Sequence, residues 1–357
     1  MAAPPAHVTR SPDLIAASDR ESNFRAHGIA CQAWDRDRAH VAVCPGTNEV
    51  HIYAVDGASS SSPKFTKLHT LAEHEQLVSA VDWSHEKNLV VTCAHDRNAY
   101  VWRHTGDGGP SAVAGGKWEP QMTLLPAHMN RAALCVQWSP REDKFALGSG
   151  SKSVSVCYYE QENDWWISKV IRKKHASSVT CVAWHANNWM LATGSSDCKC
   201  RIFCAAIRGI DGSPAAAKGA RFGEPLMEID VASGWIHGLA WSPSFASLAV
   251  AAHDACVHVV DVADGVATGG EPKCATVRLR HLPQAAVCFL DEDTIVAVGH
   301  HPHPLLFSRG PSGWALKGEV KKGSNDGAGG AKTKVCALDA KAFAVTGVSP
   351  TIDLYSM

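Results

Sequence analysis

Short apolar segments that end in a large apolar residue recur along the whole chain. The end positions are Trp34, Trp83, Trp138, Trp184 and Trp241, followed by the weaker copies Phe289 and Leu338. The steps between them are 49, 55, 46, 57, 48 and 49 residues. A repeat of about fifty residues is typical of a β-propeller blade. The pattern therefore predicts an all-β chain of seven blades.

A second apolar position follows each of the first five copies at a fixed offset of nineteen residues. These positions are Tyr53, Trp102, Cys157, Phe203 and Val260. An apolar run, a turn of small residues and an alternating run lie between the two positions, and a period of two indicates strands. The linking stretches are rich in Gly, Ser, Pro or Ala and are expected to be surface loops. We expect one domain over residues 23–357.

The charge balance argues against a nucleic-acid partner. Thirty-four Lys and Arg oppose thirty-five Asp and Glu, which gives a formal net charge of -1 and no basic field. The sequence has no run of 18 apolar residues that could insert into a membrane, and its first residues lack the apolar stretch of a signal peptide. We therefore expect a cytoplasmic protein whose thirteen cysteines are reduced thiols.

A polar set recurs in two repeats. Its members are His74, Thr92, Asp96 and Trp102 in the second repeat, and His175, Thr193 and Asp197 in the fourth. Such residues can chain hydrogen bonds between turn and strand, and they also invite a hydrolase interpretation. A catalytic set is normally built once per fold, so recurrence favours a structural network within the blades.

Other patterns that could carry chemistry are incomplete. Three histidines stand in a turn broken by prolines, at His300, His301 and His303, but no fourth zinc ligand accompanies them. Three cysteines that resemble a thiolate cluster, Cys198, Cys200 and Cys204, lack a second cysteine pair at zinc-ribbon spacing and are expected to be buried thiols. Phosphate-binding loops, nucleophile elbows and dinucleotide patterns are missing. Asp82 is the one acid in the five Trp-ended segments, so a hydrolase centred on the channel remains a minor alternative. We expect no enzyme, no cofactor and no metal site.

Surface positions are then the candidates for function. Asp164, Trp165 and Trp166 follow an acidic run, and Trp235 with His237 precedes the fifth repeat. Indoles are common both at binding hot spots and between packed elements, so both interpretations stay open. The candidate polar contacts of such an interface are Arg97, Arg131 and Arg201.

Several segments resemble the WD-repeat subunit, subunit 1, of the actin-related protein 2/3 complex. They are His51-Ile-Tyr53, Asp96-Arg-Asn-Ala-Tyr-Val-Trp102, Asn130-Arg-Ala-Ala133, Glu160-Gln-Glu-Asn-Asp-Trp-Trp166, Lys199-Cys-Arg-Ile-Phe203 and Gly234-Trp-Ile-His-Gly238. The segment with the paired tryptophans is the most specific. The resemblance covers about residues 24–357.

The resemblance implies a WD-repeat β-propeller that acts as a non-catalytic scaffold in a seven-subunit assembly which nucleates branched actin filaments. Its implied partners are the small helical subunits, the actin-related subunits, the actin filament and nucleation-promoting factors. It also implies ring closure by an N-terminal strand, expected near Phe24 to His27, which leaves residues 1–22 as an unmatched, disordered extension.

One stretch departs from the family pattern. Family members often carry a long insertion with a short helix between the last two blades, whereas residues 308–334 are expected to be a short Gly-rich linker. Whether this stretch contacts the filament directly is therefore an open question at the level of the sequence. A different interaction module, such as a ubiquitin-ligase substrate receptor or a histone-peptide reader, is the alternative that fold-level analogy leaves open.

Overall fold

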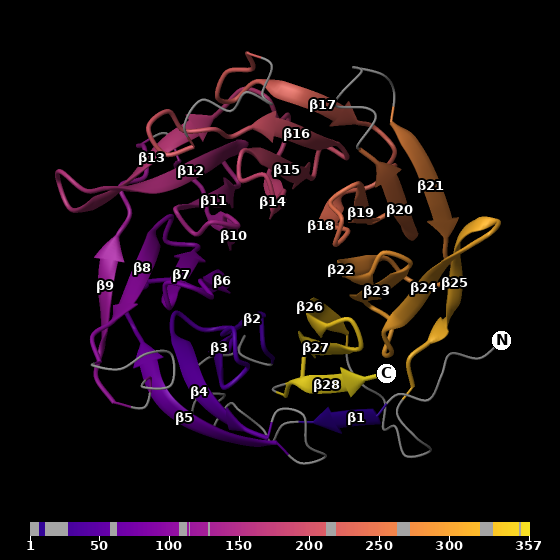
Figure 1. The fold of residues 1–357 in the computed structure, drawn as a ribbon, viewed down its shortest axis with the longest axis horizontal. Helices are drawn as coiled ribbons and strands as arrows, with labels where there is room; N and C mark the ends of the chain where they lie inside the picture. Colours follow the sequence, from indigo (N-terminus) through magenta and orange to yellow (C-terminus); the bar gives the residue numbers. More distant parts are fainter. Residues whose placement is uncertain are drawn as a thin grey trace.

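The structure is a computed structural model that describes residues 7–10, 28–57, 63–106, 113, 115–127, 129–211, 219–262, 272–321, 331–349 and 351–357. Every regular element in these ranges is a strand, and the strands form seven four-stranded antiparallel sheets. Figure 1 shows the sheets as blades around a central opening. The prediction of an all-β, seven-bladed propeller is confirmed. In the same ranges, no helix has the length and apolar character needed to cross a membrane.

Blades 1 to 4 use consecutive strands, from the innermost to the outermost. Blade 1 contains β2 (Cys31–Trp34), β3 (His40–Cys44), β4 (Val50–Asp56) and β5 (Lys64–Leu71). Blade 2 contains β6 (Val78–Trp83), β7 (Leu89–Ala94), β8 (Ala99–His104) and β9 (Trp118–Met122). Blade 3 contains β10 (Ala133–Trp138), β11 (Lys144–Ser149), β12 (Ser153–Glu160) and β13 (Trp165–Ile171). Blade 4 contains β14 (Val179–Trp184), β15 (Met190–Ser195), β16 (Cys200–Cys204) and β17 (Pro225–Ile229).

Blades 5 and 6 repeat this order, and blade 7 takes its outer strand from the N-terminus. Blade 5 contains β18 (Ile236–Trp241), β19 (Ser247–Ala252), β20 (Cys256–Asp261) and β21 (Lys273–Arg278). Blade 6 contains β22 (Gln284–Asp291), β23 (Thr294–Gly299), β24 (Leu305–Gly310) and β25 (Gly313–Glu319). Blade 7 contains β26 (Lys332–Asp339), β27 (Ala342–Gly347), β28 (Asp353–Ser356) and β1 (His7–Arg10).

The closing strand lies further toward the N-terminus than the family resemblance implied. β1 pairs antiparallel with β28 over four residue pairs, from His7 opposite Ser356 to Arg10 opposite Asp353. The expected position, 24–27, lies outside the described residues, and the prediction that all of 1–22 is an extension outside the propeller was wrong for 7–10. A four-residue edge strand is too short to show the alternation by which the inner strands were found.

The cross-strand register explains the offset of nineteen residues. In blade 2, Trp83 lies opposite Val90, and Val90 lies opposite Trp102. The first and third strands of a blade run in the same direction, so the two landmarks share one row of the sheet and point to the same face. Equivalent rows occur in blades 1, 3, 4, 5 and 6.

The apolar core is divided among the blade interfaces. Seven clusters of buried side chains can be traced in the described residues, and each one joins two neighbouring blades, including blades 7 and 1. Trp83 and Trp102 both pack against blade 1, and Trp184 and Phe203 both pack against blade 3. A single blade cannot bury its apolar face alone, so the stability of each sheet depends on its neighbours.

Residues 308–334 are more ordered than predicted. The first twelve of them complete β24 and form β25, and the last three lie in β26. The turn between β24 and β25 ends at Gly313, whose φ of 104° is unfavourable for residues with a side chain. Trp314 then packs against Phe289 with ring centroids 6.0 Å apart. The linker prediction was therefore wrong for 308–319 and 332–334, while 322–330 lie outside the described residues.

Candidate interaction surfaces and blade networks

The four polar residues predicted in blade 2 form one continuous hydrogen-bond chain. Trp102 Nε1 donates to Thr92 Oγ1 at 2.9 Å, Thr92 Oγ1 lies 2.9 Å from His74 Nε2, and His74 Nδ1 lies 2.8 Å from Asp96 Oδ2. All four side chains are buried. Burial lowers the pKa of His74, although Asp96 acts in the opposite direction. The neutral ring therefore donates from Nδ1 to the carboxylate and accepts the threonine proton at Nε2.

Blade 4 contains a variant in which Arg201 enters the network. Its Nη1 donates to Asp197 at 2.9 Å and to His175 Nδ1 at 3.0 Å, while His175 Nε2 lies 3.1 Å from Thr193 Oγ1. Because the arginine occupies Nδ1 as a donor, His175 must carry its proton on Nε2, the reverse of His74. The side chain of Phe203, which takes the place of Trp102, has no N–H group. Thr193 Oγ1 can therefore accept from the histidine and donate to the Arg201 carbonyl.

Arg201 is therefore placed differently from the exposed contact that the sequence suggested. It is 7% exposed, and its Nε also donates to Glu228 at 2.9 Å. Three hydrogen bonds from its Nη1 and Nε are made within blade 4. We assign it to the blade network, because two carboxylates and a histidine hold the guanidinium in a buried position.

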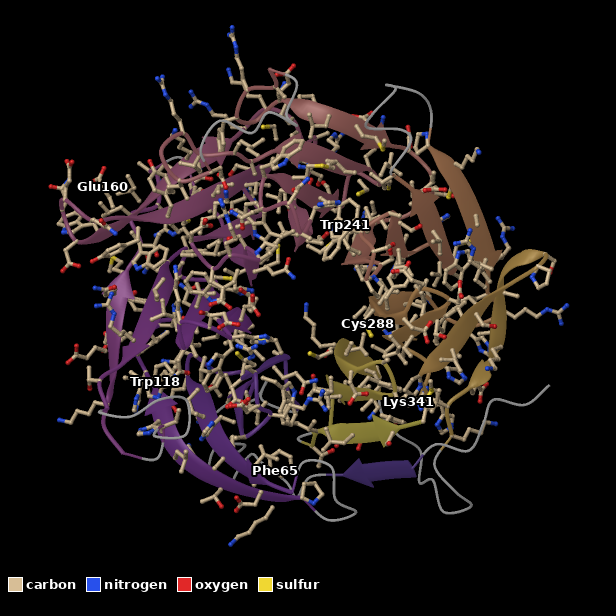
Figure 2. The ribbon with its side chains drawn as sticks, in the orientation of Figure 1. Phe65, Trp118, Glu160, Trp241, Cys288 and Lys341 are labelled. Carbon is tan, nitrogen blue, oxygen red and sulfur yellow. The ribbon has the colours of Figure 1, made fainter. Side chains whose placement is uncertain are left out.

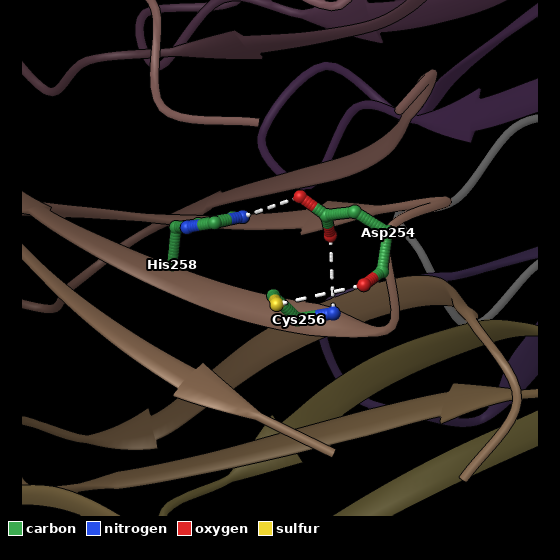
Figure 3. A group of neighbouring side chains, drawn as sticks. All are labelled: Asp254, Cys256 and His258. Carbon is green, nitrogen blue, oxygen red and sulfur yellow. Dashed lines mark hydrogen bonds and ion pairs between the residues drawn. The ribbon is translucent and has the colours of Figure 1, made fainter. Parts of the chain in front are cut away.

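Blade 5 contains a third network that the sequence did not reveal. Asp254 occupies the turn before β20 and accepts from Ser233 N at 2.9 Å, as Asp96 accepts from Glu75 N in blade 2. Its histidine, His258, lies on β20, with Nε2 3.0 Å from Asp254 Oδ2 (Figure 3). Ala232 stands where blades 2 and 4 place their loop histidine. In blades 2 and 4 the histidine precedes the aspartate by twenty-two residues, whereas His258 follows Asp254 by four. The spacing seen in those two blades therefore does not detect the network of blade 5.

The network of blade 4 should make stability depend on pH. Burial first, and then the neighbouring Arg201 charge, lower the pKa of His175 to about 4. An unfolded histidine has a pKa of about 6.5, so between these values the unfolded chain binds more protons and stability falls as the pH falls. From pH 7 to pH 5 the loss should be about 2 kcal/mol.

Chemical denaturation of the wild type and of His175→Gln at pH 7 and pH 5 measures this contribution. The variant cannot titrate at this position. Its loss of stability from pH 7 to pH 5 should therefore be about 2 kcal/mol smaller than that of the wild type. His85→Gln, at an exposed position, is the matched control and should keep the wild-type slope. An unchanged slope in His175→Gln would contradict the assignment.

Asp82 joins two blades. Its Oδ2 accepts from Trp138 N of blade 3 at 2.7 Å, and its Oδ1 accepts from Trp83 N at 3.1 Å. Gln137 does the same one blade later, with Trp184 N at 3.0 Å from its Oε1. Burial raises the pKa of Asp82 to about 7, while the two backbone donors act in the opposite direction. Both oxygens thus accept backbone hydrogen bonds, which commits this carboxylate to joining the two blades.

One of the paired tryptophans of β13 is buried and the other is exposed. Trp166 is 4% exposed and packs between Trp138 and Phe145, with ring centroids 5.5 and 5.4 Å away. Trp165 is 54% exposed. Successive residues of a strand point to opposite faces, so one indole belongs to the core between blades 2 and 3 and the other to the surface. Asp164, in the turn before them, is exposed and accepts from Tyr159 Oη.

Trp165 belongs to an exposed apolar surface, which we call the outer patch, formed by Met122, Leu124 and Trp165. Thr123 forms a bridge with Trp166, and Leu124 N donates to Trp166 O at 2.8 Å. This bridge brings Met122 and Leu124, 54% and 44% exposed, beside Trp165. Figure 2 shows the nearby Glu160, which pairs with Trp165, at the far rim of the ring, away from the central opening.

Other predicted surface residues share one face of the ring. We define the upper face as the one that carries the turns between the second and third strands of each blade. Arg97 lies in such a turn, Arg131 precedes β10, and both are exposed. Trp235, 58% exposed, precedes β18. His237 occupies a β-bulge near the start of β18, and its Nε2 lies 3.0 Å from His253 Nδ1.

A hollow opens on the same face between blades 7, 1 and 2. Its volume is about 700 Å³, and its lining includes Asn48, Glu75, Leu77, His95 and Val348. Leu77 and Val348 are 36% and 51% exposed. Apolar side chains beside a carboxylate and an imidazole suit an extended peptide segment with both apolar and polar groups.

Comparison with known proteins identifies the repeats and then the family. Residues 65–103 match the family described as WD domain, G-beta repeat, and residues 136–208 match the anaphase-promoting complex subunit 4 WD40 domain. Actin-related protein 2/3 complex subunit 1A of Arabidopsis thaliana is 44% identical over 311 residues, which span 84% of this chain and 76% of the relative. The chain belongs to the actin-related protein 2/3 complex subunit 1 family.

Relatives of the subunit 1 family come from distant organisms. Subunit 1A-B of Xenopus laevis is 38% identical over 290 residues, spanning 80% of this chain and 72% of the relative. Subunit 1 of Schizosaccharomyces pombe is 36% identical over 296 residues, spanning 82% and 74%. The resemblance drawn from the sequence motifs is confirmed, and with it the assignment to a non-catalytic WD-repeat family.

Proposed function

We propose that this chain is a non-catalytic scaffold subunit of an actin-related protein 2/3 complex in the cytoplasm. In that role it supports the nucleation of branched actin filaments and the engagement of nucleation-promoting factors. The observation that carries the proposal is the identity of 44% over 84% of the chain with a protein of that name. The carboxylate at the channel, Asp82, is occupied by backbone bonds, which agrees with a role in binding rather than catalysis.

Two surfaces divide the binding work in this proposal. The outer patch binds another subunit of the complex. Exposed apolar side chains that lie close together are unfavourable in water, and a permanent partner that covers them removes this apolar area from solvent. The upper face, with Arg97, Arg131, Trp235 and the hollow, contacts nucleation-promoting factors or the filament. Its mixture of charge and indole is typical of weaker and reversible interfaces.

Purification of the tagged chain from cells in which it replaces the endogenous subunit tests the assembly. We expect it to elute with the actin-related subunits as one large species in equal amounts, and not as a 38.1 kDa monomer. With an activator and actin, this species should nucleate branches, whereas a preparation that lacks the chain should not. Elution as a monomer, or with a cullin adaptor in place of actin-related proteins, would contradict the proposal.

A further inference from the structure

Three side chains with metal-binding groups meet on the upper face of blade 6. His281 comes from the loop before β22, His301 from the turn between β23 and β24, and Glu319 from the end of β25. Their candidate ligand atoms all lie within 4.8 Å of one another. His301 Nε2 is 3.4 Å from Glu319 Oε1, and the two imidazole centroids are 4.6 Å apart. All three side chains are half-buried, so the group is held by the fold but is reachable from solvent.

The position of this group is equivalent to that of the blade networks. One backbone hydrogen bond joins the turn to the loop before the innermost strand, as in His95 N to Leu77 O, Ser196 N to Ser178 O, His253 N to Trp235 O and His300 N to Pro283 O. The residue after that donor is aspartate in blades 2, 4 and 5, namely Asp96, Asp197 and Asp254. In blade 6 it is His301. Each aspartate accepts a backbone N–H from the loop, a bond that an imidazole in this place does not reproduce.

Two backbone groups of His303 contact Nδ1 of His301. That nitrogen lies 3.1 Å from His303 O and 3.2 Å from His303 N, so one tautomer donates to the carbonyl and the other accepts the backbone N–H. Zinc binding uses the tautomer that donates to the carbonyl. Metal-binding histidines commonly make such a bond, which leaves the lone pair of the second nitrogen for the metal. Here that nitrogen is Nε2, the atom that faces Glu319.

Glu319 presents its two carboxylate oxygens to different partners. Lys321 Nζ contacts Oε2 at 3.1 Å, and Oε1 remains directed to His301. Lys321 is 64% exposed and can move into solvent when a cation binds.

We propose that His281, His301 and Glu319 bind one Zn²⁺ ion, with the fourth position occupied by water. Two imidazoles and one carboxylate are a ligand set that zinc accepts with an open position, whereas magnesium and calcium prefer oxygen ligands alone. Zinc bonds of about 2.1 Å in a tetrahedron separate neighbouring ligand atoms by about 3.4 Å. The His301 and Glu319 atoms already stand at that separation, and rotation of the His281 side chain completes the site.

Calorimetric titration of ZnCl₂ into the full-length chain, stripped with EDTA and kept under a thiol reductant, tests the site. One equivalent should bind, the unfolding midpoint should rise with zinc concentration, and MgCl₂ should have no effect. Glu319→Gln and His301→Ala should each weaken zinc binding by about 100-fold or more. His301→Asp introduces the residue found in blades 2, 4 and 5, so it should keep the metal-free midpoint at or above the wild-type value while binding less zinc.

Nearby histidines provide the matched controls. His300→Ala removes an exposed ring next to the site, and His253→Ala removes the imidazole that contacts His237. Both variants should retain one tight equivalent. The proposal is overturned if wild type fails to bind zinc at micromolar concentrations, if His253→Ala abolishes binding while His301→Ala does not, or if all five histidine and glutamate variants bind zinc equally.

Discussion

Replacing Trp165 with alanine should leave the propeller folded and detach it from its complex. The indole is 54% exposed, so its removal costs the fold little, within about 0.5 kcal/mol. A tryptophan that anchors an interface contributes 2 kcal/mol or more, which is a loss of about 30-fold in affinity. Recovery of actin-related subunits with the tagged variant measures the effect, and circular dichroism melting measures the fold.

Trp166→Ala is the matched variant, because it removes the same side chain one position along the same strand. Its ring packs against Trp138 and Phe145, and its Nε1 donates to Gln121 at 3.3 Å. The lost contacts and the cavity should lower the free energy of unfolding by about 3–5 kcal/mol. Equal destabilisation by both variants, or normal complex recovery with Trp165→Ala, would show that the outer patch is not an anchor.

Lys332→Met should destabilise the protein by about 3–5 kcal/mol. Lys332 Nζ donates to Asp353 Oδ2 at 2.6 Å, and the two side chains are 3% and 1% exposed. The pair ties β26 to β28 in blade 7, the blade that closes the ring. Removing the ammonium takes this positive charge away from a buried carboxylate, and urea denaturation measures the loss.

The double variant Lys332→Met with Asp353→Leu separates the charge effect from packing. A buried ion pair replaced by apolar residues of similar size is often nearly neutral, so most of the stability should return. If the double variant is as unstable as the sum of the single variants, then the two side chains contribute independently and the interpretation as a coupled pair is wrong.

Part of the site could be predicted from the sequence, and the reason lies in the repeat. The network of His74, Thr92, Asp96 and Trp102 depends on spacing within one sheet, and strand geometry converts that spacing directly into contacts. The network around Asp254 was not predicted, because its histidine follows the aspartate in the sequence and so lacks the spacing seen in blades 2 and 4. Arg201 was taken for a surface residue, since a charge on a strand gives no sign of the carboxylates that bury it.

The paired tryptophans illustrate the remaining limit. Strand alternation requires Trp165 and Trp166 to point in opposite directions, but the sequence does not say which one points inward. The answer comes from the packing of blade 2 against blade 3, where Trp138 and Phe145 receive one ring. The group of His281, His301 and Glu319 likewise arises from three loops and strand ends separated by up to thirty-eight residues.

The sequence by itself determined the number of blades, the family and the identity of the innermost strands. These follow from a period of about fifty residues and from side-chain alternation, both of which are local properties of the chain. Only the tertiary structure decided where the ring closes, which indole is exposed and which polar groups meet between blades. Those outcomes depend on contacts between distant segments, and the energy of such contacts is fixed by the packing of the whole ring.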